Sequence, residues 1–222
     1  MKSPFSPLYL LGFLLLIGFL VAFVQVGILT VAFEKLGLSQ HSAILLLFSS
    51  LFGSAINLPL FSVRAEAASL EEVPARLRGL LQQAMKEFKG RTLIAVNVGG
   101  GLIPVMFSFY LMSHNPLPAG DVLLATTLVA AVCHAFSRPI AGIGIGMPIF
   151  IAPLTAAIVS LLVNSEQSAP LAYICGTLGV LIGADLLRLG NIRRMGVPVA
   201  AIGGAGTFDG IFLTGIVAVL LA

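Results

Sequence analysis

The sequence has little charge and few cysteines, and both scarcities narrow what it can be. Asp, Glu, Lys and Arg make up 9% of its 222 residues, against about 25% in an ordinary soluble domain. Hydrophobic residues make up 58%. The composition therefore excludes a sizeable soluble domain and predicts an integral membrane protein. The two cysteines, Cys133 and Cys175, lie in apolar stretches, so we expect neither a disulfide framework nor a cysteine-rich metal site.

Histidine is also scarce and scattered. His41, His114 and His134 lie far apart in the sequence, and none stands in the His-Glu-x-x-His pattern of a zinc peptidase. The GIGIG series at 142–146 lacks the strand–turn–helix setting of a nucleotide-binding loop. We therefore expect no metal ion and no cofactor.

Long apolar runs are abundant, and a run of about 20 residues is long enough to cross a membrane as a helix. We predict an all-α polytopic membrane protein of about seven spans, in which residues 1–222 form one membrane domain. The first run is too long for the core of a signal peptide, which is about 7–15 residues, so we expect it to be retained. The expected spans are 8–33, 41–63, 92–113, 121–137, 140–163, 169–189 and 197–222.

Basic residues predict how these spans are oriented. With the N-terminus in the cytoplasm and the C-terminus outside, every Lys and Arg except Lys35 falls on the inner side. That distribution follows the positive-inside rule and predicts a location in the inner, cytoplasmic membrane. Because topology accounts for the basic charge, we expect no nucleic-acid partner.

Residues 64–91 form the one long polar segment. Ser69 and Glu72 fit a capping box, and apolar residues then recur at three- and four-residue spacing. This pattern predicts an amphipathic helix on the cytoplasmic membrane surface. Its role is either that of a linker between the second and third spans or that of a gate or docking segment.

Clusters of Gly, Pro and Asn interrupt several of the predicted spans. Close packing of helices through small residues explains part of this pattern. Clusters this dense also predict discontinuous helices around an interior polar site, because freed backbone groups persist in a membrane only where protein or a wet cavity covers them. The residues expected to line that site or a pathway are Asn57, Pro59, Asn97, Gly100, Pro104, Arg138, Pro148, Gly183, Gly203, Gly204, Gly206 and Thr207.

Two aspartates inside apolar runs are the candidate chemical groups, because an ionisable side chain at membrane depth costs about 2.5–3.5 kcal/mol to insert. Asp185 lies near the cytoplasmic end of its span, where a boundary ion pair with Arg188 or Arg138 is the alternative to a functional role. Asp209 lies deeper. The glycines before it are expected to stop the helix, and Thr207 suits the N-cap of a new half-helix. Its alternative role is a structural hydrogen bond to broken backbone.

Whether the two aspartates meet depends on how the last span bends. On straight helices their depths would differ by roughly 9–12 Å, so contact requires the GGAG stretch to fold the chain back. Two carboxylates in contact share one proton, because both cannot ionise together. One can then activate water while the other protonates a peptide carbonyl or the leaving amine.

The residues around both aspartates resemble motifs of the intramembrane aspartyl proteases of the presenilin and signal-peptide-peptidase type. FD at 208–209 is similar to the Tyr-Asp motif, GAD at 183–185 to Gly-x-Gly-Asp, and APL at 152–154 to Pro-Ala-Leu. The order of the aspartates is reversed, and the second glycine before Asp185 is absent. This local resemblance implies a peptidase with Asp185 and Asp209 as its catalytic pair.

Over the whole chain, the sequence resembles the uncharacterised prokaryotic membrane family catalogued as domain of unknown function 1614. The most specific stretch is IGGAGTFDGIFLTGI. The resemblance implies broken helices and no particular activity. The segments that carry it are 53–60, 97–104, 138–148, 183–185 and 203–215.

Functions from different classes remain open. The first is an intramembrane aspartyl protease that cleaves membrane-embedded peptides with Asp185 and Asp209. The second is a proton- or cation-coupled transporter of a small solute, with Asp209 as the coupling site and Asn57 and Asn97 along the pathway. A non-catalytic scaffold or lipid-binding protein is the third. The expected partners are membrane lipid, a membrane-embedded peptide or small solute and, as an open alternative, a second copy of the chain.

Overall fold

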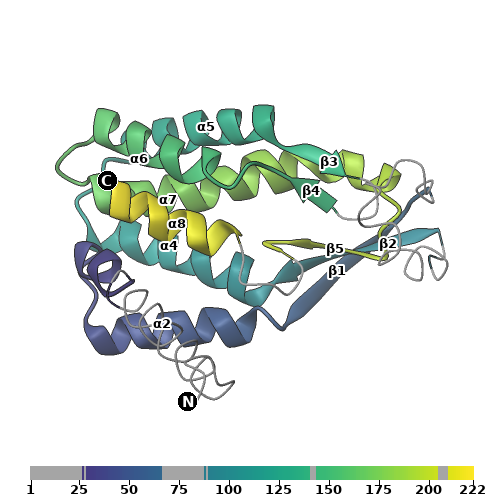
Figure 1. The fold of residues 1–222 in the computed structure, drawn as a ribbon, viewed down its shortest axis with the longest axis horizontal. Coiled ribbons are helices and arrows are strands. Elements are labelled where there is room, and N and C mark those ends of the chain that lie inside the picture. The colour runs from purple at the N-terminus through teal and green to yellow at the C-terminus, as the bar shows by residue number, and fades with distance from the viewer. Residues whose placement is uncertain (1–26, 28, 67–87, 89, 141–143, 205–209) are drawn as a thin grey trace, which may run out of the picture.

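A computed structural model shows a bundle of short helices at one end of the molecule and a small β-sheet at the other (Figure 1). Helices and strands alternate along the chain. Most segments that run from one end of the molecule to the other therefore consist of a helix joined to a strand. The residues that the structure describes are 27, 29–66, 88, 90–140, 144–204 and 210–222.

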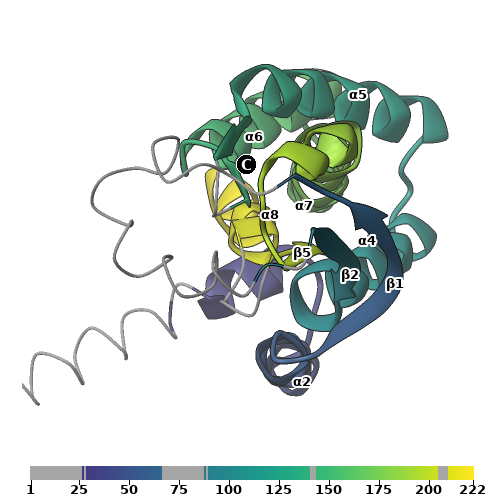
Figure 2. The same cartoon turned by 90° about the vertical axis from the view of Figure 1, so that its right-hand side faces the viewer.

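Helix α7 forms the centre of the bundle. Every residue from Pro170 to Thr177 is buried, and α7 packs against α4, α5, α6 and α8, which surround it in Figure 2. Two glycines of α7 allow this close packing: a Cβ at Gly179 would meet Val129 on α5, and one at Gly176 would meet Ala156 on α6. The bundle helices are α2 (Gln40–Gly53), α4 (Ile103–His114), α5 (Ala119–Phe136), α6 (Ile151–Val163), α7 (Ser168–Val180) and α8 (Gly210–Leu221).

Two irregular helical segments adjoin the bundle. A π-helical turn, Val98–Leu102, leads into α4. A second π-helical turn, Leu181–Asp185, ends α7 and continues as the 3-10 helix Leu186–Arg194. Such turns disturb the regular backbone ladder and are frequent at functional sites.

The main sheet has three strands in the order β1-β2-β5. β1 runs antiparallel to β2, with Asn57 opposite Asn97 at the bundle end. β5 runs parallel to β2, with Leu93 opposite Val199. β3 and β4 pair with each other in a separate antiparallel sheet. The strands are β1 (Asn57–Arg64), β2 (Arg91–Asn97), β3 (Arg138–Ile140), β4 (Gly144–Gly146) and β5 (Val199–Ile202).

The prediction of an all-α fold is therefore wrong, although helices do dominate the described residues. The expected spans 41–63, 92–113 and 197–222 each contain a helix and a strand, and the change falls at a Gly or Asn cluster. The reason is that a short apolar run reads alike as helix or as buried strand. The helices do end at these clusters, as predicted, but the chain changes there between helix and strand rather than between two half-helices.

Among the described residues, two helical segments are long and apolar enough to cross a membrane: α5 and Ser168–Arg193. A third is added if the helix Leu29–Lys35 and α2, which are bent by 114°, form one broken span. Seven full-length helical spans are not found in this part of the chain. The first expected span, 8–33, lies mostly outside the described residues, as does the expected amphipathic helix within 64–91, which connects β1 to β2.

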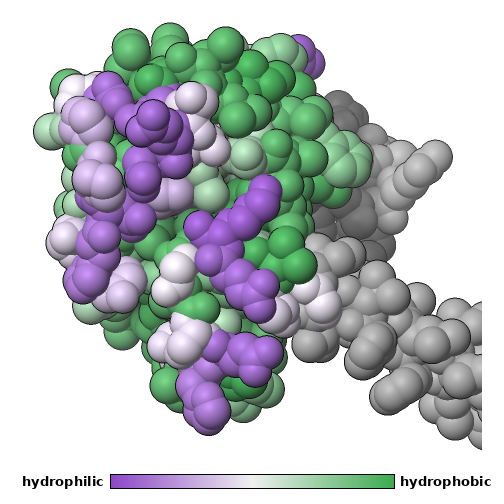
Figure 3. All heavy atoms as spheres, turned by 90° about the vertical axis from the view of Figure 1, so that its left-hand side faces the viewer, coloured by the Kyte–Doolittle hydropathy of each residue, from purple (hydrophilic) through white to green (hydrophobic). Residues whose placement is uncertain are grey.

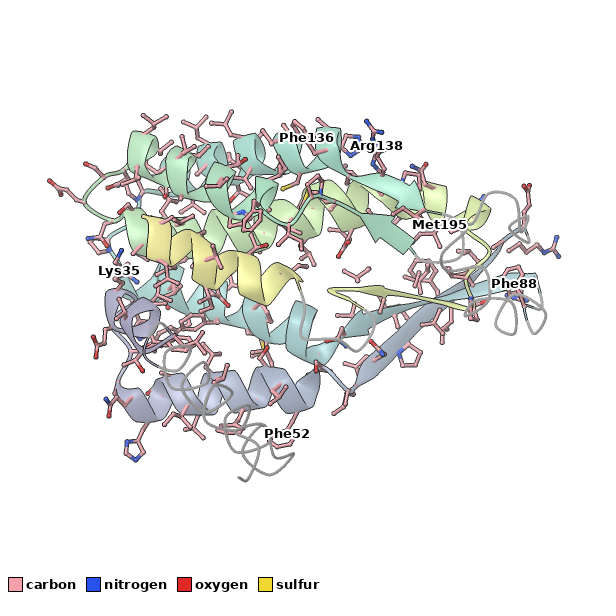
Figure 4. All side chains as sticks on the ribbon, viewed as in Figure 1. Lys35, Phe52, Phe88, Phe136, Arg138 and Met195 are labelled. Atoms are coloured by element: carbon pink, nitrogen blue, oxygen red, sulfur yellow. The ribbon has the colours of Figure 1, made fainter. Side chains whose placement is uncertain are left out.

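Polar residues mark the two ends of the bundle. Hydrophilic side chains gather at the end opposite the sheet (Figure 3). The helix ends and turns at this end of the bundle carry the exposed residues Lys35, His41, His114 and Glu166. The Lys35 Nζ donates to the carbonyl groups of Val219 and Leu220 at the end of α8, at 3.3 and 3.4 Å. Figure 4 shows Lys35 and Arg138 at opposite ends of the bundle.

Between these ends, large apolar side chains face outward. Leu45, Phe52, Phe109, Leu124 and Leu162 are all exposed. The 18 residues of α5 measure about 27 Å, close to the roughly 30 Å of a bilayer's hydrocarbon core. An apolar outer belt of this height is expected where lipid surrounds the protein.

Candidate functional site

Asp185 lies at the end of the π-helical turn that closes α7. Gly183 in that turn packs so tightly on α5 that a Cβ would overlap the Ala130 carbonyl group. The Gly183 carbonyl oxygen lies 3.1 Å from Nδ1 of His134, which also belongs to α5. The glycine therefore lets the two helices touch at the turn, and the turn sets where Asp185 points.

The carboxylate of Asp185 binds the chain just after β5. Its Oδ2 accepts a hydrogen bond from the Gly203 N–H at 2.9 Å. Gly203 has a φ of +82°, a backbone conformation that L side chains rarely adopt. Two residues predicted for the site, Asp185 and Gly203, are thus brought together, although eighteen positions separate them.

The alternative role for Asp185, a boundary ion pair with Arg188, is wrong. Arg188 donates instead to the C-terminal end of α5, with Nη2 at 2.7 Å from the His134 carbonyl oxygen and 2.9 Å from that of Ser137. Its Nε donates to Oγ of Ser137 at 3.2 Å. Arg138 lies exposed on β3, and among the described residues Asp185 makes no ion pair. The carboxylate therefore has no cationic partner in this part of the chain.

A cavity of about 570 Å³ opens beside Asp185. Its walls come from β4, the start of α6, the irregular end of α7, β5 and α8. Asp185 is the one charged side chain among its described lining residues, and most of the others are aliphatic. The volume falls within the about 300–1,000 Å³ of ligand-binding pockets, which are typically apolar with a few polar groups.

Asp209 lies outside the described residues, together with Gly206 and Thr207, so its predicted contact with Asp185 stays a prediction. The described chain on either side of it lines the cavity: Gly204 comes before the segment and Ile211 after it. Both ends of the segment that carries Asp209 are therefore on the wall that also holds Asp185.

Asn97 is the centre of a second polar group, where β2 meets the bundle. Its side chain is 1% exposed, and Nδ2 donates to the Ser54 carbonyl at 2.7 Å and to Oδ1 of Asn57 at 3.0 Å. Its Oδ1 accepts the N–H of Gly100 at 2.8 Å. The two predicted asparagines and Gly100 therefore do meet, but they hold the chain breaks together and none of them lines the cavity.

Glycine contacts join the Asn97 group to the Asp185 site. Gly99 packs against the last turn of α2, where Oγ of Ser50 donates to its carbonyl oxygen at 2.7 Å. Gly101, in the same π-helical turn, packs directly on Gly203. Added side chains at these glycines would force the backbones apart, so the breaks of three separate spans depend on small residues.

The remaining predicted residues have varied positions. Pro148 lines the cavity, Pro104 is buried at the start of α4, and Pro59 is exposed on the edge strand β1, where proline is tolerated. The prediction missed most of the cavity wall, notably β5 and Ile145 of β4. Nothing in a short apolar stretch distinguishes a wall of a binding cavity from ordinary core.

The fold defines a mainly helical protein with candidate membrane spans. Its helices give way to strands at a buried layer of glycine and asparagine. Beside this layer lies a cavity that contains the carboxylate of Asp185. The chain belongs to the family described as "Protein of unknown function (DUF1614)", whose match covers residues 51–221. The resemblance to that family seen in the sequence is thereby confirmed. No curated protein and no solved structure matches the chain.

Proposed function

We propose that this protein is an intramembrane aspartyl protease that cleaves membrane-embedded peptides with Asp185 and Asp209. One observation carries the proposal: Asp185 is the one charge among the described walls of a mainly apolar cavity. A cavity of this kind suits the apolar side chains of a membrane peptide and brings a carboxylate to its backbone. Gly204 and Ile211, which flank the Asp209 segment, line the same cavity.

The hydrogen bond from Gly203 supports a catalytic role for Asp185. It holds Oδ2 in place at 2.9 Å. Among the described residues no group binds the other oxygen, which can then take a water molecule or the second carboxylate. A reacting group held by backbone and packed glycines is preorganised, which is what catalysis by positioned groups requires.

The proposed reaction begins with one proton shared between the two carboxyl groups. The ionised carboxylate takes a proton from water while the water oxygen bonds to the peptide carbonyl carbon, and the protonated carboxyl gives its proton to the carbonyl oxygen. The resulting diol collapses as the C–N bond breaks. The first carboxyl protonates the leaving amine, and the second recovers a proton from a diol hydroxyl, so both groups return to their starting state.

The transporter hypothesis has less support from this geometry. A pathway for a cation or polar solute is lined by polar groups that replace its water, whereas the described cavity wall is mainly aliphatic. Asn57 and Asn97, which would line such a pathway, bind each other and the backbone at the chain breaks.

The proposal includes an orientation in the inner membrane. The sheet end, with exposed Arg64, Arg91, Arg138 and Arg193, would face the cytoplasm, in keeping with the positive-inside rule. The opposite end, with Lys35 bound to the end of α8, would face outward with the C-terminus. Seven passes, most of them part helix and part strand, would then cross between these ends, with the N-terminus inside.

The test is cleavage of single-span peptides by the purified protein in liposomes, read by mass spectrometry of the products. Asp185→Asn and Asp209→Asn are each expected to lower the cleavage rate at least about 100-fold, since each removes one proton-transfer group. Asp121→Asn is the matched control. Asp121 accepts a hydrogen bond from Asn164 at 2.9 Å at the outer end of α5, so its loss should leave the rate unchanged.

Each outcome of that experiment decides the proposal. Cleavage that survives both substitutions at the proposed pair would overturn the catalytic assignment. Absence of cleavage, together with proton-linked uptake of a solute that Asp209→Asn abolishes, would favour the transporter instead. Loss of cleavage in both variants, with Asp121→Asn active, would support the protease.

A further inference from the structure

Two strand edges face the cavity beside Asp185. β5 is the last strand of its sheet and pairs with β2 on one side only, and β4 pairs only with β3 among the described residues. Val199–Ile202 of β5 and Gly144–Ile145 of β4 nevertheless all line the cavity. Among the described residues, no further strand therefore pairs with either of these two edges.

The unpaired groups of β5 follow from its register with β2. The Leu93 N–H donates to the Pro198 carbonyl at 2.9 Å, and the groups of a parallel strand point alternately toward and away from its partner. The N–H groups of Val199 and Ala201 therefore point away from β2. Among the described residues neither of them has another acceptor, so both are available to pair with a further strand.

The N–H of Gly203 is the next in this series of N–H groups that point away from β2, and its acceptor is known. This N–H, two residues beyond that of Ala201, donates to the carboxylate of Asp185. The carboxylate thus occupies the next acceptor position along the open edge of β5. A strand paired with Val199 and Ala201 would run directly to the proposed catalytic group.

We propose that the cavity binds its peptide as an extended strand, paired to the open edge of β5 and lying between β5 and β4. This inference rests on the proposed function, because it names the form in which the substrate reaches Asp185. Strand addition gives affinity through main-chain hydrogen bonds, whatever the sequence of the peptide. A membrane helix must unwind to bind in this way, and the strand edge replaces the hydrogen bonds that unwinding breaks.

The walls of the cavity set the side chains that such a strand carries. Ile145, Met147, Ile192 and Met195, the last of which is labelled in Figure 4, supply an apolar lining. Methionine adapts to side chains of different shape, so the site accepts large aliphatic or aromatic residues and disfavours charged ones. Because successive side chains of a strand alternate in direction, this preference applies to every second position.

The first experiment measures binding to the Asp185→Asn variant in liposomes, since an asparagine oxygen can still accept the Gly203 N–H. The probe is a lysine-flanked peptide of alternating Leu and Val, prepared as a series with one N-methylated amide at each successive position. Alternate members are expected to bind about tenfold more weakly, because each lacks a donor to the strand edge, and the members between them should bind normally. Absence of probe binding, or an effect without this two-residue period, would overturn the inference.

The second experiment removes a donor from the protein. Ala201→Pro deletes an N–H that does not contribute to the ladder with β2, so it is expected to weaken probe binding about tenfold without loss of thermal stability. Ala201→Val also adds bulk to the cavity wall but keeps the N–H, so it is the steric reference against which the proline variant should bind about tenfold more weakly. Equal binding by both variants would contradict strand pairing at β5.

The inference and the proposed function fail separately. Periodic binding of the probe without cleavage of any peptide by the unmodified protein would leave the strand site standing and overturn the protease. Cleavage of peptides without a two-residue period in probe binding would support the protease and overturn the strand site.

Discussion

Asn97 shows how one buried amide can join three segments of a chain. Its donors reach α2 through the Ser54 carbonyl and β1 through Asn57, and its oxygen receives the Gly100 N–H of the turn before α4. Asparagine is suited to this position because its amide both donates and accepts. An aspartate would lose the donors and bring a charge to a site that is 1% exposed.

We expect Asn97→Ala to lower the free energy of unfolding by about 2–4 kcal/mol, because it leaves the Gly100 N–H and the Ser54 carbonyl buried without their partner. Thermal unfolding in detergent measures the loss. Asn115→Ala is the control. It removes a single, partly buried bond to the Leu111 carbonyl and should cost less than about 1.5 kcal/mol. Equal losses from the two variants would show that the Asn97 group does not hold the chain breaks.

Arg188 acts on the neighbouring helix rather than on the aspartate beside it. Its guanidinium donates to the last carbonyls of α5, where a positive charge also offsets the helix dipole. We expect Arg188→Ala to destabilise the protein by about 1–3 kcal/mol, measured by the same unfolding assay. Arg138→Ala, which removes an exposed side chain, should stay within about 0.5 kcal/mol. A larger effect from Arg138 would argue that it, and not Arg188, anchors this end of the bundle.

At the scale of elements, the distinctive feature is that strands continue helices within single passes of the chain. The apolar runs of the sequence indicated where apolar helices lie, and the Gly, Pro and Asn clusters indicated where those helices end. They could not predict whether the chain continues as helix or as strand after each break. TLIAVN in β2 and VAAI in β5 are apolar runs too short to show a helical or strand period.

The candidate site was predictable to a similar degree. Asp185 and the glycines before Asp209 could be selected because a charge or a cluster of glycines is unusual inside a long apolar run. That Asp185 meets Gly203 depends on the parallel pairing of β5 with β2, which joins segments about a hundred residues apart and leaves no local pattern in the sequence. The role of Arg188 was wrongly predicted for the same reason, since its acceptors come from α5.

Glycine packing between elements gives a third prediction. A Cβ at Gly99 would overlap the Ser50 carbonyl and the Ser54 N–H, so Gly99→Ala is expected to force α2 away from the turn before α4 and to abolish the yield of folded protein. Gly120→Ala is the matched control: nothing lies within 4 Å of its Cβ position in the first turn of α5. That change should be neutral or stabilising by up to about 1 kcal/mol. Size-exclusion profiles and thermal unfolding compare the two, and a normal yield from Gly99→Ala would contradict the close approach.

For the molecule as a whole, the ends of the bundle differ in charge, and this difference predicts its orientation. Single cysteines test it well, because Cys133 and Cys175 are both buried and should not react with a membrane-impermeant maleimide. In intact cells Glu166→Cys should be labelled, and Arg91→Cys should be labelled only after the membrane is opened. The reverse pattern would place the sheet outside and overturn the proposed topology.

The position of β5 has a consequence for how the molecule is made. Its neighbour β2 is synthesised much earlier: the buried bond from the Thr92 hydroxyl to the Val197 carbonyl joins residues 105 positions apart. At about 5–20 residues per second, a ribosome needs roughly 5–20 s to produce the intervening chain. During that interval the nascent protein lacks one wall of the cavity and the backbone group that positions Asp185. If Asp185 is catalytic, the enzyme cannot cleave its own unfinished chain or neighbouring nascent proteins until its last segment has been inserted.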